Sequence, residues 1–235
     1  MLRKKSTYLL LATLAIGSTQ AQAQTPLAVG VDAGTNGLGL VIHGGITETI
    51  NLRAGYNYFD ISQDVDADNN DGVEGNELRY SGDLELSNLS LIGDWYPWGG
   101  TFHVSLGAVL NNNDLTVDAE CNNAAGCEVG EDGDSFVPSQ LGTITTDVDF
   151  EDYGPYLGIG WGNPVGGETG LRWRFEIGAI YQGAPTVSMR SNGDCGLFAT
   201  ACRQALQDEE EELEDDLSSL KWYPVAQVGL SYRFR

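Results

Sequence analysis

The amino-acid sequence predicts an all-β fold: an eight-stranded antiparallel transmembrane β-barrel with short periplasmic turns and long acidic extracellular loops. Three observations support this fold class. Apolar residues alternate with polar or small ones over segments of ten or more residues, which suffices to cross a bilayer when a strand is tilted. Aromatic residues stand at the ends of these segments, as expected at a membrane interface. The connections are also asymmetric, since short turns alternate with long polar loops.

Residues 171–181 show the alternation most clearly. Trp173 and Phe175 share one face of the expected strand, whereas Arg172, Arg174 and Glu176 share the opposite face. The same pattern recurs along the chain in residues 50–58, 102–110 and 222–234. A soluble β-sandwich could alternate in this way, but its strands are usually shorter and its apolar face is buried. We therefore expect the apolar faces to meet lipid and the polar faces to line a lumen.

The N-terminus carries the features of an export signal. Arg3, Lys4 and Lys5 precede an apolar run, and an Ala-Gln-Ala sequence at 21–23 matches a signal-peptidase site. We interpret residues 1–23 as a signal peptide and residues 24–235 as the barrel domain. The alternative, a membrane anchor, needs a longer apolar run than the one present here.

The strand count must be even if both termini lie in the periplasm. Seven strands can be counted from Leu38 onward, and residues 27–33 supply an eighth. The sequence Gly-Thr-Asn-Gly at 34–37 suits a tight hairpin turn after it. Two strands change phase along their length, and we expect β-bulges near Asn88 and Pro155 at these points.

The connections divide into two classes by length. Short turns are expected at residues 47–49, 97–100 and 163–170, and long polar loops at residues 62–78, 111–142 and 190–218. Within the last loop, four leucines around an acidic tract could form one amphipathic helix capping the mouth, or the tract could be disordered. Those leucines are Leu206, Leu213, Leu217 and Leu220.

The four cysteines fall as two close pairs. An exported protein enters an oxidising compartment, so disulfides are expected. Of the three possible connectivities we favour the local pairs, Cys121 with Cys127 and Cys195 with Cys202. A zinc site is the weaker alternative, because neither pair has the C-x2-C spacing and both histidines lie elsewhere.

Charge excludes some functions and suggests others. The chain of 235 residues has 12 Lys and Arg against 34 Asp and Glu, a formal charge of −22, which argues against nucleic-acid binding. Most acids fall in the three long loops, where they would form an acidic mouth that attracts small cations. The alternative is an ordinary solvated surface. The candidate mouth residues are Asp64, Asp66, Asp68, Asp71, Glu209, Glu210, Glu211 and Glu212.

Charged residues also fall on the predicted lumen side. Isolated charges inside a narrow barrel are costly, so we expect them to form a paired network near the short-turn end. Such a network either plugs the barrel or lines a selective path. Its candidate members are Arg53, Asp94, His103, Arg172, Arg174, Glu176 and Arg233.

Several segments resemble the CarO-type outer-membrane proteins, the ornithine-uptake porin family. They read Tyr-Pro-Trp-Gly-Gly at 96–100, Asn-Asn-Asp-Leu at 112–115, Pro-Tyr-Leu-Gly-Ile-Gly at 155–160, Glu-Ile-Gly-Ala-Ile-Tyr-Gln-Gly-Ala-Pro at 176–185 and Tyr-Pro-Val-Ala-Gln-Val-Gly at 223–229. The resemblance implies an eight-stranded outer-membrane barrel that admits small basic amino acids, with a link to carbapenem entry. It transfers no site residue. The sequence departs from common barrels in ending Phe234-Arg235, and its acidic tract is unusually charged.

From these observations we expect a small outer-membrane porin for passive uptake of small solutes, with basic amino acids such as ornithine as the expected cargo. The alternative is a closed structural barrel with a role in adhesion or envelope integrity. We expect no enzyme activity, because neither histidine has an evident serine and carboxylate partner. We also expect no cofactor and no metal. The expected partners are outer-membrane lipid, lipopolysaccharide and small cationic solutes, with the chain a monomer.

Overall fold

The computed structural model describes residues 25–68, 77–121, 127–129, 134–136, 141–193 and 199–234. Eight strands form a closed antiparallel ring: β1 (Leu27–Gly34), β2 (Gly37–Gly45), β3 (Ile50–Asp68), β4 (Glu77–Trp95), β5 (Phe102–Asn111), β10 (Tyr153–Trp161), β11 (Gly170–Tyr181) and β13 (Trp222–Arg233). The ring closes because β4 also pairs with β5. The predicted eight-stranded barrel is confirmed. None of the helices within these ranges is long and apolar enough to span a membrane.

The faces of the barrel follow the predicted alternation. On β11, Trp173 is 60% exposed and points outward, whereas its neighbour Arg174 is 2% exposed and points inward. The outward face carries a band of apolar side chains that suits lipid. Representative members are Val31, Leu40, Ile42, Leu91, Leu106, Leu157, Leu230 and Tyr232.

Aromatic residues gather at both ends of this band. At the short-turn end, Phe102 lies between Trp98 and Trp161, with ring centroids 5.3 and 5.6 Å away. At the opposite end Tyr181 and Trp222 meet edge to face. This arrangement matches the interfacial girdles of membrane barrels.

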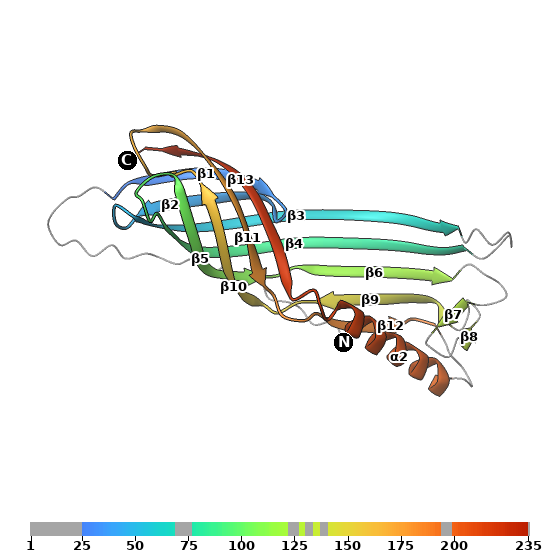
Figure 1. The fold of residues 1–235 in the computed structure, drawn as a ribbon. Helices are drawn as coiled ribbons and strands as arrows, with labels where there is room; N and C mark the ends of the chain where they lie inside the picture. Colours follow the sequence, from blue (N-terminus) through green and yellow to red (C-terminus); the bar gives the residue numbers. More distant parts are fainter. Residues whose placement is uncertain are drawn as a thin grey trace, which may run out of the picture.

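Beyond the barrel, the outer parts of β3 and β4 continue into a second sheet (Figure 1). Both strands have 19 residues, about 60 Å at the usual rise, which far exceeds the apolar band of a bilayer. There β4 pairs with β6 (Asp114–Cys121), followed by β9 (Thr143–Asp149) and β12 (Thr186–Ser191). We call this the extension sheet. In a separate two-stranded sheet, β7 (Cys127–Val129) pairs antiparallel with β8 (Asp134–Phe136).

The prediction of three long polar loops is therefore wrong in part, because segments of all three form strands or a helix. Helix α2 (Ala199–Leu217) confirms the helical alternative for the acidic tract. Its position differs from the prediction, since α2 packs beside β12 at the margin of the extension sheet rather than over the barrel mouth (Figure 1).

The expected β-bulges are also wrong. The register of β4 against β3 is continuous from Glu77 to Trp95, and β10 pairs with β5 without a break at Pro155. The apolar residues of β4 switch from even to odd positions at Asn88, because β4 passes there from the extension sheet into the barrel. Leu84 and Leu86 share the inward face, which is apolar in the extension sheet and polar in the lumen. Val148 simply belongs to β9 and not to the barrel strand β10.

Candidate functional site

The interior of the barrel near its short-turn end holds a group of buried charged side chains. Six strands of the ring supply them, each at an inward position of the two-residue alternation. We call this group the charge network: Asp32, Arg53, Asp94, His103, Ser105, Tyr156, Arg174 and Glu176. All are at least nine-tenths buried.

Glu176 is the centre of the network. Its Oε1 accepts a hydrogen bond from Arg53 Nη2 at 2.6 Å and another from the Tyr156 hydroxyl. Its Oε2 accepts from Arg174 Nη1 at 2.9 Å, and two weaker donors complete its shell. These are Ser105 Oγ at 3.1 Å and His103 Nε2 at 3.2 Å. Five donor groups thus surround one carboxylate, with Ser105 sharing its single hydrogen between Glu176 and Asp94 Oδ1, which lies 2.7 Å away; these contacts explain how a charge can sit inside a narrow barrel.

Two further carboxylates flank the guanidinium groups. Arg174 Nη2 donates to Asp32 Oδ2 at 2.8 Å, and Arg53 Nε lies 3.4 Å from Asp94 Oδ1. Negative and positive groups therefore alternate across the lumen, with a carboxylate at each end and Glu176 between the two arginines. Removing one partner would strand a buried charge, at a cost of about 3–5 kcal/mol.

A layer of apolar residues lies against the network and narrows the lumen. Ile92, Val109, Ile180 and Val225 pack with Tyr156. A cavity of about 20 Å³ remains between this layer and the opposite wall, where β1, β3 and β4 supply polar side chains and β2 supplies Val41. That volume holds about one water molecule, so the lumen is filled at this level.

A second polar layer lies between the charge network and the extension sheet. Seven buried carboxamides form it, and we call it the amide layer: Asn36, Asn57, Asn88, Asn111, Asn113, Gln182 and Gln227. Asn57 pairs in register with Asn88, which pairs with Asn111, so these three stand at one height. Sequence reasoning missed this layer, although Asn57 follows Arg53 by four residues on the inward face.

Several amide atoms lack hydrogen-bond partners within the described structure. They are Asn36 Oδ1, Asn57 Nδ2, Asn88 Oδ1 and Asn111 Oδ1. Asp32 Oδ1, in the neighbouring charge network, also lacks a partner there. Four of these five atoms are acceptors. Buried acceptors without partners are unfavourable unless water or a ligand satisfies them, so the layer suits a donor group.

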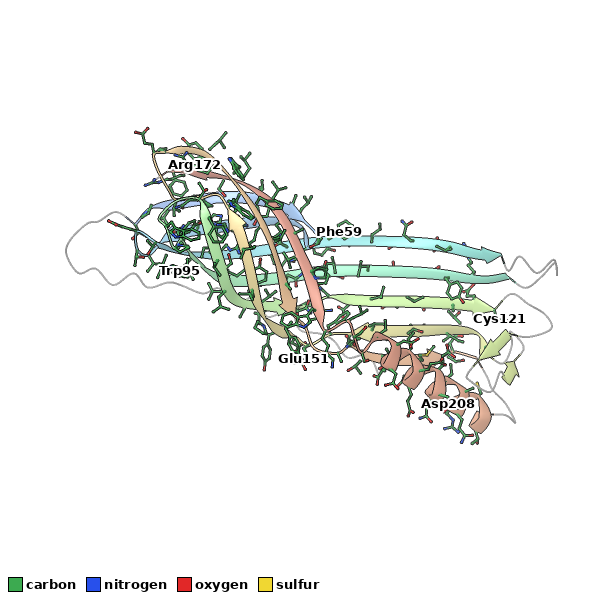
Figure 2. All side chains as sticks on the ribbon, viewed as in Figure 1. Phe59, Trp95, Cys121, Glu151, Arg172 and Asp208 are labelled. Carbon is green, nitrogen blue, oxygen red and sulfur yellow. The ribbon has the colours of Figure 1, made fainter. Side chains whose placement is uncertain are left out.

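The structure brings together five of the seven charged residues expected in the lumen: Arg53, Asp94, His103, Arg174 and Glu176. Arg172 lies instead at the short-turn rim (Figure 2). Arg233 is also outside the network, since it pairs in register with Gly170, the first residue of β11. Arg172 Nη2 donates to the carbonyl oxygen of Glu168 at 2.9 Å. Asp32 was missed, although the outward positions of Val29 and Val31 place it on the inward face.

Asp94, His103 and Glu176 also place donor atoms within 4.8 Å of one another, close enough for a metal ion. Their oxygens already face Arg53 and Arg174, however. Two fixed guanidinium groups within hydrogen-bond distance oppose a divalent cation, so these residues fit an ion-pair network better than a metal centre.

Seven of the eight candidate acidic residues lie on the extension sheet and its helix. Asp64 is exposed and accepts a hydrogen bond from Ser81 Oγ. Asp66 and Asp68 belong to β3, while their side chains and all of Asp71 lie outside the described residues. Glu209, Glu210, Glu211 and Glu212 all belong to α2.

Two acids of α2 have a structural role. Glu210 and Glu214 accept hydrogen bonds from the backbone N–H groups of Met189 and Val187 on β12, each at 2.9 Å. The step of four residues from Glu210 to Glu214 rises about 6 Å along the helix, which is close to the length of the two-residue step from Val187 to Met189 along the strand. The two carboxylates therefore match the two N–H groups. The helix therefore covers the outer edge of the extension sheet with carboxylates.

The cysteines lie beside this helix. Cys121 and Cys202 each take part in a disulfide bond, and both belong to a small apolar cluster with Leu141 and Ala205. The pairing among the four cysteines stays a prediction.

Comparison with known proteins places the fold. No protein-family profile and no curated protein sequence matches the chain. Among solved structures, it is similar to Acinetobacter baumannii CarO2, with 25% identity and a TM-score of 0.56 over 90% of this chain and all of that one. It is also similar to Acinetobacter baumannii CarO, with 25% identity and a TM-score of 0.53 over 88% of this chain and 97% of the other. The resemblance seen in the sequence is confirmed by this structural similarity to the CarO proteins, and the chain is an eight-stranded outer-membrane β-barrel.

Proposed function

We propose that this barrel is a narrow passive channel for small solutes with a positive charge, and that ornithine and similar basic amino acids are its cargo. The observation that carries the proposal is the amide layer with its unpartnered acceptors, which leads to the charge network. Polar side chains of β1, β3 and β4 connect the two layers along one side of the cavity. An ammonium group has three N–H donors and no acceptor, so it suits this wall.

The electrostatics of the lumen also favour a cation. Three carboxylates, Asp32, Asp94 and Glu176, face two guanidinium groups. The acidic residues of the extension sheet would raise the local concentration of cations at the entrance. An anion gains nothing from the lumen carboxylates or from the acidic entrance, and both arginines are already paired with carboxylates.

Passage requires the network to rearrange, since about one water molecule fits beside it. Glu176 bonds to both arginines, so it is the group whose movement would open the path. We therefore expect slow, selective permeation rather than a large steady conductance. Lipid and lipopolysaccharide contact the outer face in this proposal, and the monomer is the working unit.

The alternative is a closed structural barrel, and the small cavity favours it. Single-channel recording of the refolded full chain distinguishes the two. The channel proposal expects brief cation-selective openings that become more frequent in Glu176→Gln, because the replacement loses its charge pairs with Arg53 and Arg174. Arg172→Gln, at the rim, is the matched control and should not change the openings. If neither folded wild type nor folded Glu176→Gln produces channel current, the closed barrel is established.

A further inference from the structure

The extension sheet has two edge strands, β12 and β3, and only the edge of β12 is covered by a described element. On the β12 margin, carboxylates of α2 accept hydrogen bonds from the strand edge. On the opposite margin, β3 pairs with β2 only as far as Tyr58. From residue 60 to residue 68, β3 pairs with β4 on one side and with no described strand on the other. Figure 1 shows this part of β3 along one margin of the sheet, with α2 along the other.

A strand edge of this kind presents a row of hydrogen-bonding groups. Every second residue of β3 directs its N–H and C=O away from β4. The nine residues from 60 to 68, of which about half direct these groups outward, span about 30 Å, longer than a typical strand. An exposed edge of this length is a template for another extended chain.

The side chains along the edge alternate in character. Asp60, Ser62 and Asp64 share one face, whereas Ile61, Gln63 and Val65 share the other, and all six are exposed. The acidic face continues onto β4, where Asp83 lies opposite Ser62. Asp60 stands directly opposite Glu85, a like-charge pair that weakens the sheet until a cation lies nearby.

These observations select the occupant. A second copy of this chain would bring the carboxylates of two edges together, so charge repulsion opposes self-pairing. A peptide with basic residues facing Asp60 and Asp64 would offset the repulsion, and apolar residues between them would cover Ile61 and Val65. We propose that the outer half of β3 binds extended peptides of alternating basic and apolar residues by strand addition. This inference is independent of the channel proposal.

The test uses the full chain refolded in detergent micelles and a fluorescent ten-residue peptide of alternating lysine and valine. Fluorescence anisotropy should show saturable binding beyond that to empty micelles. The same peptide with glutamate in place of lysine should not bind. A lysine peptide N-methylated at two successive central residues has both strand edges blocked, and its affinity should fall at least about ten-fold. Equal binding of the N-methylated peptide would overturn strand addition.

Protein variants locate the site. The double variant Asp60→Lys/Asp64→Lys should lose at least about ten-fold in affinity, because like charges would then face the peptide. Glu211→Lys/Glu212→Lys makes the same change of charge on the exposed face of α2 and is the matched control. Equal losses in both double variants, or the absence of binding to wild type, would refute the assignment. Peptide affinity should be the same in wild type and in folded Glu176→Gln, because Glu176 lies in the barrel lumen and not on the extension sheet, which separates this result from the channel proposal.

Discussion

Arg53 bridges two buried carboxylates, and its replacement tests whether the charge network is a dry structure. In Arg53→Met, Glu176 keeps its pairing with Arg174, but Asp94 keeps only the hydroxyl of Ser105, 2.7 Å away. A buried carboxylate without a cation should cost about 3–5 kcal/mol of the free energy of unfolding. Adding Asp94→Asn removes the stranded charge while keeping the side-chain shape. The double variant should therefore recover about 0.5–3 kcal/mol relative to Arg53→Met, the range of coupling between groups in contact.

The assay is equilibrium unfolding in urea of the full chain folded into phosphatidylcholine vesicles, followed by tryptophan fluorescence. Arg172→Met is the control, because Arg172 lies at the rim outside the network. Two results would refute the reasoning. One is a loss below about 1 kcal/mol in Arg53→Met, which would mean that water solvates Asp94. The other is a double variant less stable than Arg53→Met alone.

Three further predictions concern other parts of the molecule. Glu210→Ala/Glu214→Ala should speed hydrogen exchange at the amides of Val187 and Met189 at least about ten-fold, since each charged hydrogen bond contributes about 1.5–3 kcal/mol, while Glu211→Ala should not. Unchanged protection of these amides would show that the carboxylates do not hold the edge. Gly160→Ala would place a Cβ 2.6 Å from the carbonyl oxygen of Phe175 and 2.5 Å from His103 Nε2, so it should lower the yield of folded barrel on a gel mobility assay; Gly100→Ala meets no atom within 4 Å and should fold normally. Equal yields would mean that the barrel wall gives way easily at Gly160. Peptide mapping under non-reducing conditions should find Cys121 joined to Cys127 and Cys195 to Cys202, and a crossed pair would refute that connectivity.

The barrel could be predicted from the sequence because lipid imposes a strict rule on each strand. Outward residues must be apolar, so Trp173 and Phe175 alternate visibly with Arg174 and Glu176. Inward charges must then meet, which predicts a network without showing its pairs. The central position of Glu176 depends on strand registers, and no local pattern contains them.

The extension sheet could not be predicted in the same way, because outside the bilayer the outward face is free to be polar. The alternation in residues 59–65 is interrupted by Gln63 and acidic neighbours, so it reads as a polar loop. The amide layer was hidden for another reason. Asparagine is depleted in strands and favoured in turns, so Asn57 and Asn88 carry a local signal that opposes their actual position.

The comparison of ornithine and glutamate entry into proteoliposomes tests the functional claim most directly. If the amide layer and the acidic extension sheet select cations, ornithine should enter at least about ten-fold faster than glutamate. Asn88→Leu should remove most of that preference while leaving the barrel folded. Equal entry of the two amino acids, or a preference that survives Asn88→Leu, would contradict the account.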